Sequence, residues 1–233
     1  MAYKRFFVEQ LSEHLFVIGQ APAIGEYEIT DCHVYLIVGP SHVLAVDAGG
    51  GESWPFVKAV AECYGFAQKP ISYVLVTHGH GDHARGLPQF EGQGALTVSS
   101  AYTAEHLESE AIADVLFERD GILSLHEAAP EVVLTPGHTP GCASYRLTVD
   151  GKLCLFTGDL IQEDGGLGWC GSEGFSQEQV LRSLKRLAAM PAPDWLLTGH
   201  SFVQGGMQVI QKGIRYGEAG QWVPWTDEAP KMP

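Results

Sequence analysis

Residues 77–86 concentrate side chains that bind metal ions. The stretch reads THGHGDHARG and places His78, His80, Asp82 and His83 within six positions. Because a glycine follows each of the first two histidines, the backbone can turn closely enough for both imidazoles to reach one divalent ion. Asp82 and His83 follow at once and are placed to serve a second ion, which lies about 3.5–4 Å from the first in two-metal sites. The pattern therefore predicts a metal centre with room for two ions.

Three further residues of the same kinds follow apolar runs elsewhere in the chain. His138 ends the run VVLTPGH, Asp159 follows LCLFTG, and His200 ends DWLLTGH, just as His78 ends ISYVLVTH. Strand ends on one rim of a sheet structure converge, so we expect these three residues to lie close to the ligands in residues 78–83. A histidine outside such a pattern is usually a surface or hydrogen-bonded residue, and we expect that of His14, His33, His42, His106 and His126.

The elements that must position these residues are short β-branched runs alternating with helical patterns. Before the metal-binding motif we expect strands over 15–19, 32–39, 42–49 and 71–78, with a helix over 53–66. After it we expect a strand over 95–99, a helix over about 101–119, a hairpin across 144–160 that turns at Asp150-Gly151, and a last strand over 194–200. Ser176 with Gln179 forms a capping box that opens a helix through residue 190.

Composition restricts the class of protein. With 233 residues, 45% hydrophobic and 18% charged, the chain is expected to form a single domain over residues 1–233 with a substantial core. A formal charge of −14 repels phosphate backbones and anionic membranes, so we expect a small-molecule substrate and neither nucleic acid nor membrane as partner.

The sequence also bears on compartment and assembly. Glu9, Glu13 and His14 interrupt any apolar signal segment near the N-terminus, so we interpret this stretch as mature protein. No apolar stretch approaches the length of a membrane helix, and the five cysteines are odd in number and widely spaced, which favours the reducing cytoplasm. Strongly apolar strands at the surface would support a homodimer.

Four motifs together resemble the metallo-β-lactamase-fold superfamily: THGHGDH, PGHTPG (136–141), FTGDL (156–160) and LLTGH (196–200), in that order. The resemblance covers about residues 11–210 and implies an α/β fold, an αββα four-layer sandwich with a dinuclear site at one edge. It implies that one metal is held by His78, His80 and His138, the other by Asp82, His83 and His200, and that Asp159 bridges both. It further implies that Asp47, in AVDAGG, supports the metal loop from behind.

The ligand set that this resemblance implies narrows the activity. β-Lactamases usually lack a carboxylate where Asp159 stands and are typically exported, and flavo-diiron oxygen reductases have glutamate where His80 stands, so neither class is favoured. Two divalent ions, with zinc first and manganese, iron or cobalt as alternatives, would lower the pKa of a bridging water so that hydroxide attacks a carbonyl. Asp82 is the candidate catalytic residue that accepts or passes on the proton.

The substrate is less closely defined than the metal site. Glyoxalase II enzymes and acyl-homoserine-lactone lactonases both resemble this arrangement, so an ester, lactone or thioester of a small acid is expected. Glutathione recognition would fall to Lys212 and Arg215, the candidate cations after His200. The Gly-rich segment 162–174 is expected to form a substrate wall in which Trp169 stacks on a ligand, while Tyr27 is a candidate hydrogen-bond donor on the facing loop.

Two other functions stay open at this point. Persulfide dioxygenases keep the HxHxDH motif but use a single iron held by two histidines and an aspartate, for redox chemistry. Transfer-RNA 3′-processing nucleases and related phosphodiesterases share all seven ligands, but they need an RNA-binding surface, and this chain has 14 Lys plus Arg against 28 acidic residues. A binding or scaffold protein on this fold would normally have lost ligands, so the complete set argues against one.

Overall fold

Alternate residues of each central strand face two different cores. In the computed structural model, which describes residues 5–21 and 30–224, Leu15 and Val17 of strand β2 (Leu15–Ala21) face the opposite sheet, whereas Phe16 and Ile18 face a layer of helices. Successive side chains of a strand point to opposite faces, so a strand that is apolar on both faces must be covered on both. This pattern requires a layered sandwich.

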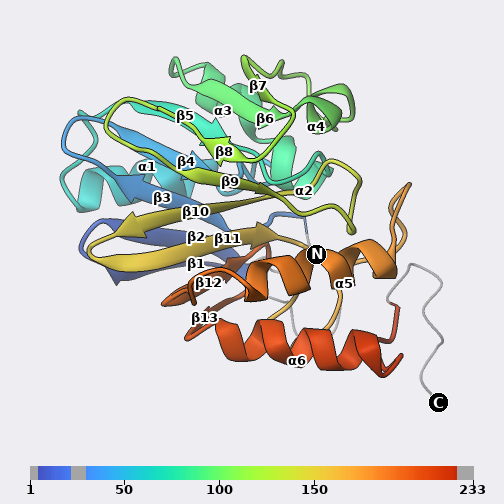
Figure 1. The fold of residues 1–233 in the computed structure, drawn as a ribbon. Helices are drawn as coiled ribbons and strands as arrows, with labels where there is room; N and C mark the ends of the chain where they lie inside the picture. The colour runs from blue at the N-terminus through green and yellow to red at the C-terminus, as the bar shows by residue number, and fades with distance from the viewer. Residues whose placement is uncertain (1–4, 22–29, 225–233) are drawn as a thin grey trace.

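Two sheets form the middle of that sandwich (Figure 1). The first has seven strands in the order β1 (Arg5–Ser12), β2, β3 (Val34–Val38), β4 (Val43–Val46), β5 (Ile71–Leu75), β6 (Leu96–Ser100) and β7 (Val115–Phe117). The second has six in the order β13 (Phe202–Gln204), β12 (Trp195–Thr198), β11 (Lys152–Gly158), β10 (Ala143–Val149), β9 (Glu131–Leu134) and β8 (Gly121–Ile122).

Helices cover the two outer faces. Helices α1 (Trp54–Cys63) and α3 (Leu87–Glu91) contribute Val57, Val60, Leu87 and Phe90 to the core against the seven-stranded sheet. Helices α5 (Gln177–Ala188) and α6 (Met207–Glu218) pack on the six-stranded sheet through residues such as Leu184. Two short helices, α2 (Gly81–Ala84) and α4 (Ala101–Glu105), follow strands β5 and β6. The predicted αββα four-layer sandwich is confirmed.

Strand direction determines where the loops gather. Strands β4 to β7 run parallel to one another, and β11 runs parallel to β12. Strand β9 has the same direction as β11 because each pairs antiparallel with β10. The segments that follow β5, β9, β11 and β12 therefore leave the two sheets toward one edge, and these are the segments that carry the predicted ligands.

The predicted hairpin turn is confirmed, and the predicted capping box is confirmed in one of its two hydrogen bonds. The β10–β11 hairpin turns at Asp150 and Gly151, which have φ of 51° and 74°, the left-handed conformation that a two-residue turn requires. Ser176 caps α5 by accepting a hydrogen bond from the backbone N–H of Gln179 at 3.3 Å. The backbone N–H of Ser176 donates to the Gly137 carbonyl, which replaces the reciprocal half of the predicted capping box.

The predicted helix over 101–119 is wrong. Helix α4 ends at Glu105, and the chain then returns to the sheet edge, where Asp114 exchanges two 2.8 Å bonds with the backbone of Thr97 and leads into β7. Ile112, one of the apolar residues that suggested a helix, is 80% exposed. Residues 115–117 pair with β6 instead, and this places Phe117 in the core between the two sheets. Within the described residues, no helix is long and apolar enough to cross a membrane.

Candidate metal centre

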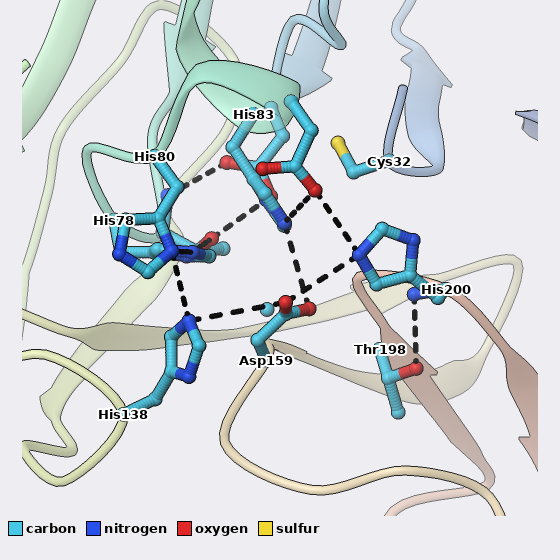
Figure 2. Close-up of polar contacts among 12 residues, drawn as sticks. Cys32, His78, His80, His83, His138, Asp159, Thr198 and His200 are labelled. Carbon is cyan, nitrogen blue, oxygen red and sulfur yellow. Dashed lines mark hydrogen bonds and ion pairs between the residues drawn. The ribbon is translucent and has the colours of Figure 1, made fainter. Parts of the chain in front are cut away.

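Three imidazoles from two segments of the chain point at one position (Figure 2). His78 follows β5, His80 immediately precedes α2, and His138 follows β9. The Nδ1 atom of His80 lies 3.1 Å from Nε2 of His78 and 3.0 Å from Nε2 of His138. The structure thus brings together the three residues to which the family resemblance assigns the first metal.

Hydrogen bonding alone accounts poorly for this convergence. A ring nitrogen carries either one hydrogen or one lone pair in the ring plane, so Nδ1 of His80 cannot bond well to two other nitrogens at once. Nitrogen atoms bound to one tetrahedral zinc at about 2.0–2.1 Å lie roughly 3.3 Å apart, close to the spacing seen here. The arrangement fits three ligands of one ion.

A second group adjoins the first and combines carboxylates with imidazoles. It consists of Asp82, His83, Asp159 and His200, whose ligand atoms lie within 4.8 Å of one another. Nε2 of His200 is 3.2 Å from Asp82 Oδ2 and 3.4 Å from Asp159 Oδ2. Asp159 Oδ2 is also 3.9 Å from Nε2 of His138, so this carboxylate lies between the two groups.

Two buried atoms of the second group have no hydrogen-bond partner. Nε2 of His83 and Oδ1 of Asp159 are both enclosed and both unpaired in the part of the chain that the structure describes. Nδ1 of His83 is 2.8 Å from Asp47 Oδ2, which holds a hydrogen on Nδ1 and directs Nε2 at the centre. Buried polar atoms are rarely left without partners, and a cation is a partner that both would accept.

The electrostatics of the centre depend on burial and on the close acid–imidazole pairs. Burial lowers the pKa of His78 well below its usual value and that of His138 to about 4, so both rings are neutral and ready to act as ligands. Burial also opposes charge on His200, but Asp159 beside it raises the pKa of that ring to about 9. Burial disfavours the charged form of Asp159, yet His200 and His83 together hold its pKa well below the usual value.

Asp47 supports the ligand loop from the end of β4. Its carboxylate accepts hydrogen bonds from the backbone N–H and the hydroxyl of Thr77, at 2.8 and 2.9 Å, besides its bond to His83. Asp47 has a φ of 56°, an uncommon conformation for a residue other than glycine. The structure places Asp47 where the sequence expected a supporting aspartate.

Two glycines keep the centre open. A Cβ at Gly199 would overlap Asp159 and His83, and a Cβ at Gly158, whose φ is 51°, would overlap Thr77. The loops that carry Asp159 and His200 therefore approach the His78–His83 segment as closely as backbone allows.

Two residues that support the centre were missed in the sequence. Cys32 is fully buried with His83 and Asp47 beside it, its backbone N–H donates to the Asp82 carbonyl, and burial raises the pKa of its thiol to about 12. The hydroxyl of Tyr35 donates to the carbonyls of Thr198 and Ser201, at 2.6 and 3.0 Å, and so holds the turn that carries His200. Their only sequence signal is their place on the apolar run 32–39, which is also what a core strand looks like.

Among the described residues, two cavities lie beside the centre. One of about 360 Å³ is lined by His80, Trp169, Tyr102, Leu107 and acidic residues, and the Trp169 and His80 rings meet edge to face at 5.7 Å. The other, of about 660 Å³, lies beside His200 and is lined by Leu167, Tyr216 and Trp222 among others. Trp169 is thus placed as a wall of the site, whereas Tyr27 lies outside the described residues. Neither Lys212 nor Arg215 lines these cavities.

Comparison with known proteins agrees with the fold. The profile described as the metallo-beta-lactamase superfamily matches residues 28–200. A curated protein named hydroxyacylglutathione hydrolase from Methylococcus capsulatus is 30% identical over 178 residues, 76% of this chain and 64% of that protein. A second of the same name, from Cereibacter sphaeroides, is 31% identical over 66% of this chain and 56% of its own length. The chain therefore matches about three-fifths of the length of these relatives.

Solved structures show the same architecture. A metallo-beta-lactamase from Pontibacter korlensis superposes with a TM-score of 0.73 at 17% identity and covers 92% of this chain and 99% of its own. At such identity the likeness concerns the fold alone.

Proposed function

The chain belongs to the metallo-beta-lactamase superfamily, and from this membership and the two adjoining donor groups we propose that it is a dinuclear metal-dependent hydrolase. His78, His80 and His138 would hold one ion, Asp82, His83 and His200 the other, and Asp159 would contact both. The observation that carries the proposal is that Nε2 of His83 and Oδ1 of Asp159 are buried, lie 3.5 Å apart and make no hydrogen bond to any residue that the structure describes. A single ion in the three-histidine group would leave both atoms without a partner.

We propose zinc as the metal in both positions. Imidazole with carboxylate is a donor set that zinc accepts, although manganese, iron and cobalt bind the same groups and occupancy follows availability. The donors of both groups fit zinc. The first group supplies three neutral imidazoles, and the second supplies two imidazoles and two carboxylates.

Bound divalent ions would supply a nucleophilic water of lowered pKa and polarise the substrate carbonyl. The residues of the chain supply orientation and proton transfer. We propose that Asp82 would accept the proton of the attacking water and pass it to the leaving group. In support, its side chain is 25% exposed and its Oδ2 lies 3.2 Å from Nε2 of His200, within the second group. Asp47 holds His83 in one tautomer, and Trp169 closes the side of the site next to His80.

The reaction that fits this arrangement is hydrolysis of a small ester, lactone or thioester. The names of the curated relatives support a thioester in particular. The proposal includes a small-molecule substrate and no nucleic acid, given the net charge of −14. All five cysteines are free thiols, which supports a reducing compartment such as the cytoplasm.

The test combines metal content with turnover. Protein loaded with zinc should bind about two ions per chain and release thiol from a thioester, with activity rising as the second ion binds. The chain offers a matched pair of variants: His83→Asn removes a proposed ligand, and His126→Asn removes a histidine at the opposite end of the sandwich. Equal activity in the two variants would contradict the assignment.

A further inference from the structure

The two cavities beside the metal centre share one property, which is negative charge. Glu108 and Glu173 line the cavity next to His80, and Glu163 and Asp164 line the cavity next to His200. Among the lining residues that the structure describes, neither cavity has a lysine or an arginine. A substrate that reaches the metals from either side therefore meets carboxylates.

Two cations lie beside these cavities, and each contacts a residue of the wall, Glu108 in one cavity and Tyr216 in the other. Arg85 pairs with Glu108 at 2.9 Å, and both side chains are more than half exposed. Lys212 lies over the ring of Tyr216, 5.5 Å from its centroid. Recognition of an anionic group usually needs a guanidinium or ammonium directed at it, and the described walls present none.

The remaining lining is suited to an apolar or cationic group. In the cavity next to His80, Trp169, Tyr102 and Leu107 form an apolar surface. Aromatic faces attract cations, and the carboxylates at the rim add to that attraction. The net charge of −14 acts in the same direction over a longer range.

We propose that the site selects thioesters or esters with an apolar acyl group and a neutral or positively charged leaving group, and that it disfavours the anionic thioesters of glutathione. This substrate class rests on the proposed hydrolase function. This class differs from hydroxyacylglutathione, for which the curated relatives are named. It makes the acidic pair Glu163 and Asp164 a determinant of specificity.

A matched pair of substrates tests the proposal: a hydroxyacyl thioester of glutathione, and the same thioester with both glutathione carboxylates masked as esters. The reacting carbonyl is identical, so its contact with the metals is the same in both substrates. We expect kcat/KM, followed by thiol release, to favour the masked thioester by about ten-fold or more at low salt. Raising the ionic strength from about 0.01 to about 0.15 M should narrow this preference, since screening shortens from about 30 to about 8 Å.

Variants and a binding measurement test whether the acidic residues of the cavity cause this substrate preference. Glu163→Gln with Asp164→Asn should reduce the preference several-fold, and the amide still offers the oxygen that accepts a bond from Gly166. Glu62→Gln, on the exposed face of α1, removes a charge away from the site and should leave the preference unchanged. The affinities for S-methylglutathione, a thioether that cannot be hydrolysed, and for its diester should show the same order without turnover.

Three outcomes would overturn the proposal. Equal or better hydrolysis of the free glutathione thioester would overturn the substrate class while leaving the hydrolase function intact. Loss of S-methylglutathione binding in Lys212→Gln would show that this lysine recognises the carboxylates, with the same consequence. Zinc-loaded protein that hydrolyses neither thioester would contradict the hydrolase function itself, and the substrate class with it.

Discussion

The chemistry of the site depends on which ring nitrogen of each histidine faces the centre. His83 is the clearest case, because one ring nitrogen is held by Asp47 and the other is buried without a partner. The residue types and their spacing were readable in the sequence, since HGHGDH has few other uses. Which nitrogen of each ring faces the centre was not readable, because that depends on hydrogen bonds between residues far apart in the chain.

Replacing a proposed ligand should abolish turnover. We expect His80→Ala and Asp159→Ala each to lower kcat/KM by a factor on the order of 10³ or more, because the reacting water and carbonyl lose their activation. The control is His126→Asn at the opposite end of the sandwich, where asparagine tolerates the φ of 50°. A ligand variant that retains activity within a few-fold of the parent would exclude that residue from the centre.

Removing the charge of Asp47 should weaken the metal without unfolding the protein. Asp47→Asn keeps a side chain that suits positive φ, but it exchanges a carboxylate for an amide against the Nδ1 hydrogen of His83. We expect metal affinity to fall by about 10–100-fold, as measured by competition with a chromophoric chelator. Unchanged affinity would mean that Asp47 serves only the Thr77 turn.

Metal binding should release protons at neutral pH. With the pKa of His200 raised to about 9 by Asp159, the metal-free ring is protonated at pH 7, and the pKa of His83 is raised as well by the acidic groups around it, despite burial. Apparent affinity should therefore decrease as the pH falls below about 9. Calorimetry at pH 7 in buffers of different ionisation enthalpy should detect about one to two protons released for each metal pair. A binding enthalpy independent of the buffer would contradict this.

At the scale of elements, strand ends determine the site. The runs that end at His78, His138, Asp159 and His200 were predicted from apolar pattern, and the structure places their ends at one edge. The helix over 101–119 was predicted wrongly because residues 115–117 pair with strand β6, and a local sequence pattern does not show such pairing. The Tyr35 contact to the His200 turn joins residues 163 positions apart, which no local pattern reveals.

Removing the hydrogen bonds of the Tyr35 hydroxyl should weaken metal binding at His200 and not at the other group. Tyr35→Phe removes the hydroxyl that donates to the buried carbonyl of Thr198, while the Ser201 carbonyl keeps bonds from the backbone N–H and the hydroxyl of Thr198. We expect the unfolding free energy to fall by about 1–3 kcal/mol in denaturant titration. The matched variant Tyr145→Phe loses a comparable buried bond to the Val76 carbonyl. Both should cost stability, but only Tyr35→Phe should weaken the ion bound by His200. Equal metal affinities in the two variants would show that Tyr35 has only a structural role.

At the scale of the whole molecule, the metal centre joins the two halves of the sandwich. His78 and the α2 residues follow the seven-stranded sheet, whereas His138, Asp159 and His200 follow the six-stranded one (Figure 1). Ions held between the sheets bind the folded chain and not the separated strands, so they should stabilise the fold. The layered fold and its motif order could be recognised from sequence, while the charge of the cavity walls required the structure.

Removing metal should lower the melting temperature of the entire chain. Free metal at about 1,000 times its Kd adds about 4 kcal/mol, which for a chain of this size corresponds to roughly 8–16 °C in Tm. Calorimetry of chelator-treated and zinc-reloaded protein measures the difference. Identical melting temperatures would show that the acid–imidazole groups bind no ion tightly.

The most direct test of the central claim is a metal titration in which bound metal and thioester hydrolysis are measured on the same sample. The account predicts that about two zinc ions bind per chain and that hydrolysis follows the second. Protein that binds one iron, takes up oxygen with glutathione persulfide and does not hydrolyse thioesters would contradict it, and would make His83 and His200 supporting residues of a mononuclear site.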